Sequence, residues 1–459
     1  MNARGILPAL LLLAVSAAAQ DPHFAQPDGT TALHRAVEAN QEDIVAALLA
    51  KGADPNAANR YGITPLWLAA TNGSATVTRM LLKAGAGATA KLPHGETALM
   101  AAARTGEPET IKLLIAAGAD PNAHETSQGE TALMWAAAEN HPEAIRALFK
   151  GGANPNLHGK ALDLAPMKWM QVGMVDTMLA SGGWTAVMYA ARQDAQDAVR
   201  ALAESGADLN AQDADGTTAL QFAIINQHYD LAGMLLEKGA NPNVADNTGM
   251  TSVYAAVDMN TFRSDIGRPP RRLLDKLSAL DVLRLELKHG GDPNAQLRKA
   301  VLGRHHGFGD GSLGQGATAL MRAVKSSDLE AMQVLLDAGA DISLGMTNGT
   351  NPVLLLAGTR AGPGPGAGDK EVAALRLLAK SGANLNAANA RGERALHAAA
   401  RQGSNAIVRA LVELGADLNA TDSSGKTALD LAIQPGGRGG GHEDTAAILR
   451  ELAAKRAQQ

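Results

Sequence analysis

The side chains best suited to chemistry lie in one glycine-rich segment, HHGFGDG at residues 305–311. Two adjacent imidazoles, His305 and His306, together with the carboxylate of Asp310 could reach a single metal ion. A surface loop whose polar side chains are merely solvated has the same composition. Two interpretations therefore stay open for residues 297–314: a metal-dependent or hydrolytic site, or a solvated loop without a site.

A second candidate pair consists of His124 and His158, because each follows a glycine of a recurring sequence by six residues. Packed elements lie roughly 8–10 Å apart, whereas each ligand of a zinc ion lies about 2 Å from the metal. Equivalent positions in neighbouring repeats therefore cannot share one ion without a large excursion of the loops. We expect no metal site at this pair.

No catalytic motif accompanies these histidines. The chain has no cysteine, which excludes disulfides, thiolate zinc sites and thiol nucleophiles. It contains no G-x-S-x-G, H-E-x-x-H or Walker sequence. Prolines interrupt the glycine run at 361–368 and remove the N–H groups that a phosphate cradle needs. We therefore expect no enzyme, no cofactor and no metal, with residues 297–314 as the alternative.

Composition narrows the class of protein further. Aromatic residues make up only 3% of the 459 residues, which argues against several conventional domains with large cores. Alanine, glycine and leucine predominate instead, as suits many small helices packed closely together. A net charge of −5 gives no electrostatic reason to expect nucleic-acid binding.

A recurring frame of 33 residues must position any site in this chain. Its first marker is Thr-Ala-Leu or a close variant, which starts at residues 31, 64, 97, 131, 185, 218, 251, 318, 351, 394 and 427. Its second marker is Gly-Ala-Asp-Pro-Asn or a variant, which starts at residues 52, 118, 152, 206, 239, 290, 382 and 415, with weaker copies at 85 and 339. Because the two markers keep the same phase, the period is real.

Each position of the frame has a physical role in a pair of helices. The threonine caps the first helix, and Pro65 fits the first helical position, where no hydrogen bond is lost. A second apolar pattern predicts a second helix, which a left-handed glycine such as Gly118 ends. Asn351 and Arg394 replace the capping threonine, and we expect weaker caps at these two repeats.

This succession of helix, short turn, helix and extended loop resembles the ankyrin repeat, as does the T-P-L-H-x-A signature. The resemblance covers residues 28–452 in eleven repeats. It implies an all-α ankyrin-repeat solenoid of helix-turn-helix repeats with hairpin-like loops and four insertions. It also implies a partner that is another protein, bound by the concave face and the loop tips.

Irregular steps between the markers predict the domain organisation. We expect a signal peptide at 1–19, repeats one to four at 28–158, a Met- and Trp-containing insertion at 159–182, repeats five to seven at 183–296 with an inserted loop at 261–272, a His/Gly-rich inserted loop at 297–314, and repeats eight to eleven at 315–452 with a flexible Gly/Pro loop at 361–368. The insertion that contains Trp169 either covers its neighbouring repeats or offers an adaptable contact to a partner.

The first residues are typical of a secretory signal. Arg4 supplies positive charge, residues 6–15 are apolar, and Ala17-Ala18-Ala19 provides small residues for cleavage. An apolar run of this length is too short to span a bilayer, which takes about 20 residues. We therefore expect cleavage after Ala19, a secreted or periplasmic protein and no transmembrane anchor. In length and signal the chain is similar to secreted bacterial ankyrin-repeat proteins.

The resemblance implies that partner contacts come from loop tips, from the residue before the capping threonine and from the end of the first helix. These positions hold Tyr61, Ile63, His94, Glu96, Arg104, Gln128, Glu130, Trp184, Arg192, Met250 and Asp258. Bulky side chains at exposed tips are expected to anchor an interface; for Trp184 the alternative is cover by the preceding insertion. We expect a monomeric, non-enzymatic protein-binding scaffold, with a structural envelope component or an exported effector as further alternatives.

Overall fold

The computed structural model describes residues 21–23, 25–161, 182–261, 275–300, 312–359, 368–434 and 442–458. These ranges contain 22 α-helices, and their only β-structure consists of isolated bridges. The helices form eleven pairs, each made of a first and a second helix, which confirms the expected all-α repeat solenoid. Within these ranges no helix is both long and apolar enough to cross a membrane.

The chain divides into two compact units, with the boundary between Phe222 and Ala223. Unit 1 contains α2 (Ala32–Glu38), α3 (Glu42–Ala50), α4 (Pro65–Thr71), α5 (Ala75–Lys83), α6 (Ala98–Thr105), α7 (Pro108–Ala116), α8 (Ala132–Ala138), α9 (Pro142–Lys150), α10 (Ala186–Arg192), α11 (Gln196–Glu204) and the start of α12 (Ala219–Ile225). Unit 2 contains the rest of α12, α13 (Tyr229–Glu237), α14 (Ser252–Asn260), α15 (Ala279–Lys288), α16 (Ala319–Lys325), α17 (Leu329–Asp337), α18 (Pro352–Ala357), α19 (Asp369–Lys380), α20 (Ala395–Gln402), α21 (Asn405–Glu413), α22 (Ala428–Ile433) and α23 (Glu443–Ala457).

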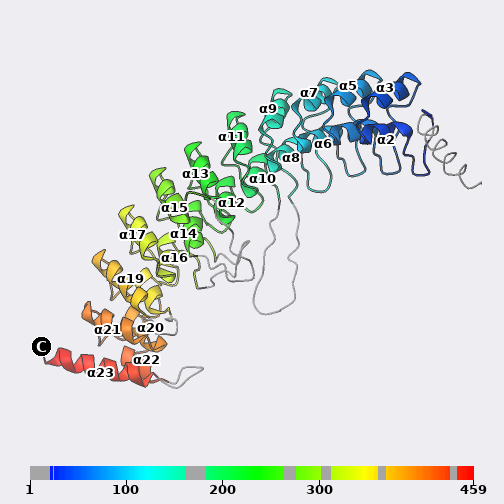
Figure 1. The fold of residues 1–459 in the computed structure, drawn as a ribbon. Coiled ribbons are helices and arrows are strands. Elements are labelled where there is room, and N and C mark those ends of the chain that lie inside the picture. The colour runs from blue at the N-terminus through cyan, green and yellow to red at the C-terminus, as the bar shows by residue number, and fades with distance from the viewer. Residues whose placement is uncertain are drawn as a thin grey trace, which may run out of the picture. The chain divides into compact units, whose positions relative to one another are not determined.

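Within each unit, first helices pack on first helices and second helices on second helices. In unit 1, α3, α5, α7 and α9 form one row and α2, α6 and α8 lie in the other (Figure 1). Alanines such as Ala69 and Ala102 are fully buried and let the first helices approach closely. Leucines such as Leu81 and Leu114 fill the core beneath the second helices, each contributing on the order of 1.5–3 kcal/mol.

Most helix ends match the roles that the sequence predicts. The Thr97 hydroxyl accepts the Met100 N–H at 3.2 Å, and Gly118 adopts a left-handed φ of 91° after α7. The expected weak cap at Asn351 is wrong. Its Oδ1 accepts the Leu354 N–H at 2.9 Å, because asparagine caps a helix as well as threonine does.

Arg394 does lack the hydroxyl cap, as the sequence indicates. Its backbone N–H is instead donated to His397 Nδ1 at 3.3 Å. Its guanidinium spans two loops, donating to the Asn386 carbonyl at 3.1 Å and to the Thr421 carbonyl at 2.9 Å. This arginine therefore joins neighbouring repeats instead of capping its own helix.

The last asparagine of the Gly-Ala-Asp-Pro-Asn marker also joins neighbouring repeats, a role that sequence reasoning missed. The Asn294 amide donates to the Gly339 carbonyl at 3.1 Å and accepts the Asp341 N–H at 2.6 Å. Asparagines at residues 56, 122, 243 and 386 bridge to the next repeat in the same two-bond manner. We call this series the asparagine ladder.

The segments predicted to be insertions lie between helices: after α9, after α14, after α15 and after α18. Most of their residues lie outside the described ranges, at 162–181, 262–274, 301–311 and 360–367. A further break, between α22 and α23, was not predicted. Its glycine-rich sequence at 436–441 was the available signal.

Candidate functional site

Glu130, immediately before the capping Thr131 of repeat four, is at the centre of the candidate site. Its Oε2 accepts the indole N–H of Trp135 at 2.7 Å. The same carboxylate faces Tyr189 of repeat five. Burial first, and then the Glu130 carboxylate beside its hydroxyl, raise the pKa of this tyrosine. Glu130 thereby connects aromatic side chains of two successive repeats.

Tyr189 continues the contact to further aromatic rings. Its ring meets Trp184 edge to face, with centroids 5.3 Å apart and planes at 74°. Trp184 meets Phe222 in the same geometry at 5.4 Å. Trp184 is half-buried, and its Nε1 has no hydrogen-bond partner within the described ranges. Such edge-to-face pairs favour one fixed arrangement of the rings.

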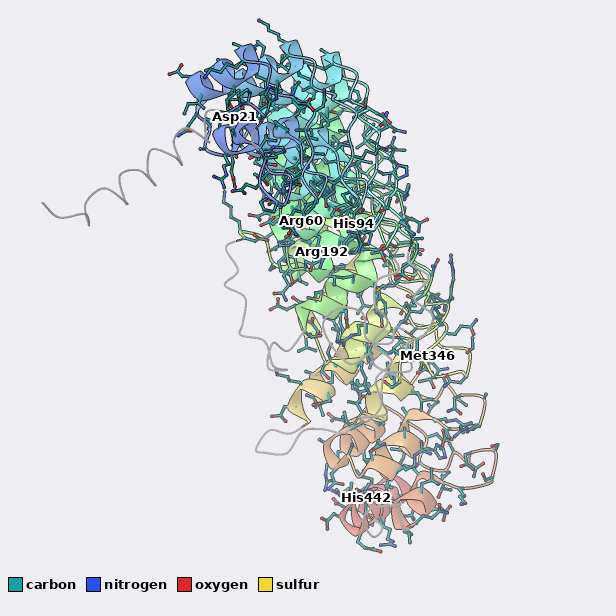
Figure 2. All side chains as sticks on the ribbon, turned by 90° about the vertical axis from the view of Figure 1, so that its right-hand side faces the viewer. Asp21, Arg60, His94, Arg192, Met346 and His442 are labelled. Carbon is teal, nitrogen blue, oxygen red and sulfur yellow. The ribbon has the colours of Figure 1, made fainter. Side chains whose placement is uncertain are left out.

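Two arginines lie over the indole rings of this group. Arg104 Cζ is 5.3 Å from the ring centroid of Trp135, and Arg192 Cζ is 4.8 Å from that of Trp184. Both side chains are exposed, and Arg192 stands at the end of α10 (Figure 2). Arg104 makes no ion pair with any described residue. Stacking holds the Arg104 guanidinium flat while its N–H groups stay available.

These residues form one continuous set that we call the aromatic–arginine network. Its members are Arg104, Glu130, Trp135, Trp184, Tyr189, Arg192 and Phe222. The set runs from repeat three to repeat six and lies entirely in unit 1. The structure thus brings together four of the predicted contact residues: Arg104, Glu130, Trp184 and Arg192.

Sequence reasoning missed the three rings that connect them. Trp135, Tyr189 and Phe222 each stand four residues after the capping threonine, in repeats four, five and six. An aromatic residue at the same register in successive repeats was the signal, in a chain with only 13 aromatics. Comparison of loop tips alone could not reveal it, because these positions lie on the first helices.

The other predicted residues of unit 1 lie on neighbouring loops. Tyr61 is 57% exposed, with Arg60 stacked on its ring at 5.4 Å. Ile63 and Glu96 are half-buried. His94 is exposed (Figure 2). Its carbonyl accepts the backbone N–H of Thr126, in the loop of the next repeat, at 2.8 Å.

Gln128 makes an equivalent link, since its carbonyl accepts the Lys160 N–H at 2.6 Å. Its side chain is exposed. Consecutive loop tips are therefore held by backbone hydrogen bonds, and their side chains are displayed at fixed spacing.

The expectation that Met250 lies at an exposed tip is wrong. It is 3% exposed. The Asp246 carboxylate accepts the N–H groups of Thr248 and Met250, at 2.6 and 3.1 Å, and the Thr248 carbonyl accepts the N–H of Arg298. These bonds fold the loop back, so that Met250 is not displayed to a partner.

Asp258, the last predicted contact, is half-buried at the end of α14 in unit 2. It forms an ion pair with Arg322 of the following repeat. Like Met250, it belongs to unit 2 and is no member of the network. Its carboxylate therefore has a structural partner within the chain.

The segments proposed to hold other chemistry mostly lie outside the described residues. His305, His306 and Asp310 do, as does Trp169. His158 bonds through Nδ1 to the Gly183 carbonyl at 2.9 Å, which ties it to the loop of repeat five. Across the described ranges, no three His, Asp or Glu side chains gather in a way that could hold a metal.

Comparison with known families covers most of the chain. A family model described as ankyrin repeats (3 copies) matches residues 3–92, 85–158 and 164–260, more than half of the sequence. A model described as ankyrin repeats (many copies) matches 377–432, and a single ankyrin repeat matches 315–345. No curated protein matches the chain.

Proposed function

The chain belongs to the ankyrin-repeat family, and on that premise we propose that it is a secreted or periplasmic, non-enzymatic scaffold that binds a protein partner through unit 1. Stacked repeats of this kind support protein binding in general, because they display residues at regular spacing along an extended face. The observation that carries the choice of unit 1 is the aromatic–arginine network.

The network has the composition of an interaction surface. Tryptophan, tyrosine and arginine are the side chains that most often dominate binding energy at interfaces. Here Trp135, Trp184 and Tyr189 are already held by ring contacts and by the Glu130 carboxylate. Side chains that are ordered before binding lose less conformational entropy when a partner docks.

Arg104 indicates the chemistry of the partner. Arg104 is stacked, exposed and unpaired among the described residues. The one carboxylate inside the network, that of Glu130, is occupied by Trp135 and Tyr189. Arginine binds carboxylates with paired, charge-assisted hydrogen bonds. We therefore assign the surface to a protein segment that carries aspartate or glutamate side chains.

Two features support the remaining parts of this proposal. The composition of residues 1–19 supports export, and a chain without cysteine needs no disulfide in an oxidising compartment. The net charge of −5 gives no support to nucleic-acid binding. No catalytic motif in the sequence supports an enzymatic role.

A binding experiment with matched variants tests the proposal. Proteins from a periplasmic or secreted extract are captured on the wild type, on Trp135→Ala with Trp184→Ala, and on Phe149→Ala. Phe149 is a suitable control, because it is a 42% exposed aromatic of unit 1 on a second helix, outside the network. We expect the double variant alone to lose a specific partner by at least tenfold in affinity, about 1.4 kcal/mol. Equal recovery of every captured protein by all three would exclude the network as the binding site.

An arginine variant tests the chemistry of the partner separately. Arg104→Lys keeps the charge but loses the planar, stacked guanidinium. We expect weaker binding of the captured partner. Neutralising the acidic residues of the partner should then cost Arg104→Lys less affinity than it costs the wild type, because the paired hydrogen bonds are already lost. Unchanged affinity in Arg104→Ala would show that the partner is not recognised through carboxylates at this position.

A further inference from the structure

Repeat seven departs from all the others at one core position. Ten of the eleven repeats have a glycine that ends the second helix. Four residues before this glycine, nine of the ten have leucine, and repeat seven has Glu286. The leucines are all buried: Leu48, Leu81, Leu114, Leu148, Leu202, Leu235, Leu335, Leu378 and Leu411. A carboxyl group thus occupies a site that the fold otherwise fills with an apolar side chain.

Two neighbouring positions of the same repeat also depart. Ser252 begins α14 where every other first helix begins with Ala or Pro. Gly291 follows the helix-ending glycine where the other nine repeats have Ala. A Cβ at Gly291 would lie 2.9 Å from the Glu286 carbonyl oxygen and 2.9 Å from Val253 Cγ2. The core of repeat seven is therefore rebuilt at three adjoining positions.

The Glu286 side chain has no compensating partner. The residue is 0% exposed, and neither carboxyl oxygen has a hydrogen-bond partner among the described residues. The nearby Ser252 hydroxyl is donated to the Pro242 carbonyl at 3.0 Å. Burial raises the pKa of Glu286 to about 8, against a smaller lowering effect of Ser252. A carboxylate in this place would be both desolvated and unpaired, which is costly.

No charged group on the surrounding helices offsets that cost. Helices α13, α14 and α17 pack against α15. Their acidic and basic side chains, and those of α15 itself, are Asp230, Glu237, Asp258, Glu330, Asp337, Asp281, Arg284 and Lys288. None of them shifts the pKa of Glu286, whose only influences are burial and Ser252. Among the residues that the structure describes, protonation is therefore the remaining way to neutralise this carboxyl group.

We propose that Glu286 makes repeat seven, α14 and α15, a protonation-controlled weak point of unit 2. The repeat packs while the carboxyl group is neutral and opens when the group loses its proton. The inference concerns unit 2 alone and does not depend on the partner proposed for unit 1.

The direction of the pH dependence follows from the two states. Opened, Glu286 has the ordinary pKa of glutamate, about 4.3, and packed it has a pKa of about 8. Between these values the packed repeat holds one more proton than the open repeat. The stability of the packed repeat is therefore highest below about pH 4.3, and it falls as the pH rises towards 8. Across that window the open population increases about tenfold per pH unit.

Hydrogen exchange on the full chain tests this proposal. Exchange of α14 and α15 is measured at pH 5.5 and 7.5 and corrected for the intrinsic rate, with α20 and α21 as internal references. In the wild type we expect the opening of α14 and α15 to increase about 100-fold over these two pH units. Glu286→Gln has no proton to lose, and Glu286→Leu restores the residue of the other repeats; both should show no such increase.

An exposed glutamate provides the control. Glu330→Gln on α17 removes an exposed carboxylate of the next repeat. In this variant the opening of α14 and α15 should increase with pH as it does in the wild type. If Glu286→Gln fails to fold, Glu286→Leu alone decides the question. A wild type without pH dependence in α14 and α15, or a Leu variant with the wild-type slope, would overturn the proposal.

Discussion

Glu130 stabilises the network because its carboxylate accepts the indole N–H of half-buried Trp135 and lies beside the hydroxyl of half-buried Tyr189. Truncation in Glu130→Ala leaves the Trp135 N–H without its acceptor. We expect a loss of about 1–3 kcal/mol in the free energy of unfolding, measured by urea denaturation. Glu96 precedes the capping threonine of repeat three in the same register, but its side chain forms no hydrogen bond with any residue that the structure describes. Glu96→Ala should therefore change stability little, and equal losses in the two variants would contradict this role of Glu130.

Single residues were also where prediction from the sequence was weakest. The register of Trp184 and Glu130 pointed to a binding surface, but not to the rings of Trp135 and Tyr189 that hold them. Met250 had the same register as Trp184 yet is buried. The difference arises from hydrogen bonds between loops, which the period of the sequence does not encode. The repeat predicts the backbone position that carries a side chain, whereas tertiary contacts decide whether that side chain is exposed.

At the scale of elements, the asparagine ladder makes a testable difference between repeats. Ser343 occupies the ladder position of repeat eight, and among the described residues it bonds only to Asp341 of its own turn. Ser343→Asn should add the two bonds to repeat nine that Asn294 makes to repeat eight, and raise stability by about 1 kcal/mol. The reverse change, Asn294→Ser, should lower it by a similar amount in chemical denaturation. A neutral or destabilising Ser343→Asn would show that the ladder does not hold repeats together.

Helices were predictable because their signals are local. A capping threonine and a left-handed glycine each act within one turn of their own helix, so two markers sufficed to place eleven pairs. Asn351 shows the limit of a motif-based argument, since it departs from the motif but keeps its chemistry. The break after α22 was missed because it lies beyond the last copy of the second marker.

At the scale of the whole molecule, the two proposals concern different units and different conditions. Unit 1 carries a surface of fixed rings and arginines, and its proposed task is to bind. Unit 2 carries a buried acid, and its proposed property is a stability that depends on pH. A chain exported from the cell meets variable pH without the buffering of the cytoplasm. If the chain is exported, the binding surface of unit 1 and the pH-dependent stability of unit 2 therefore operate in the same environment.

The export proposal makes a prediction that is independent of the fold. Signal peptidase reads small residues at two alternating positions, which are Ala17 and Ala19 if cleavage follows Ala19. Ala19→Leu should block processing, whereas Ala18→Leu, between the two, should be processed like the wild type. Intact-mass measurement of protein from the secreted or periplasmic fraction should find a chain that starts at Gln20 in the wild type and in Ala18→Leu. An unprocessed wild type confined to the cytoplasm would remove the proposed compartment but leave the binding surface of unit 1 to be judged by its own variants.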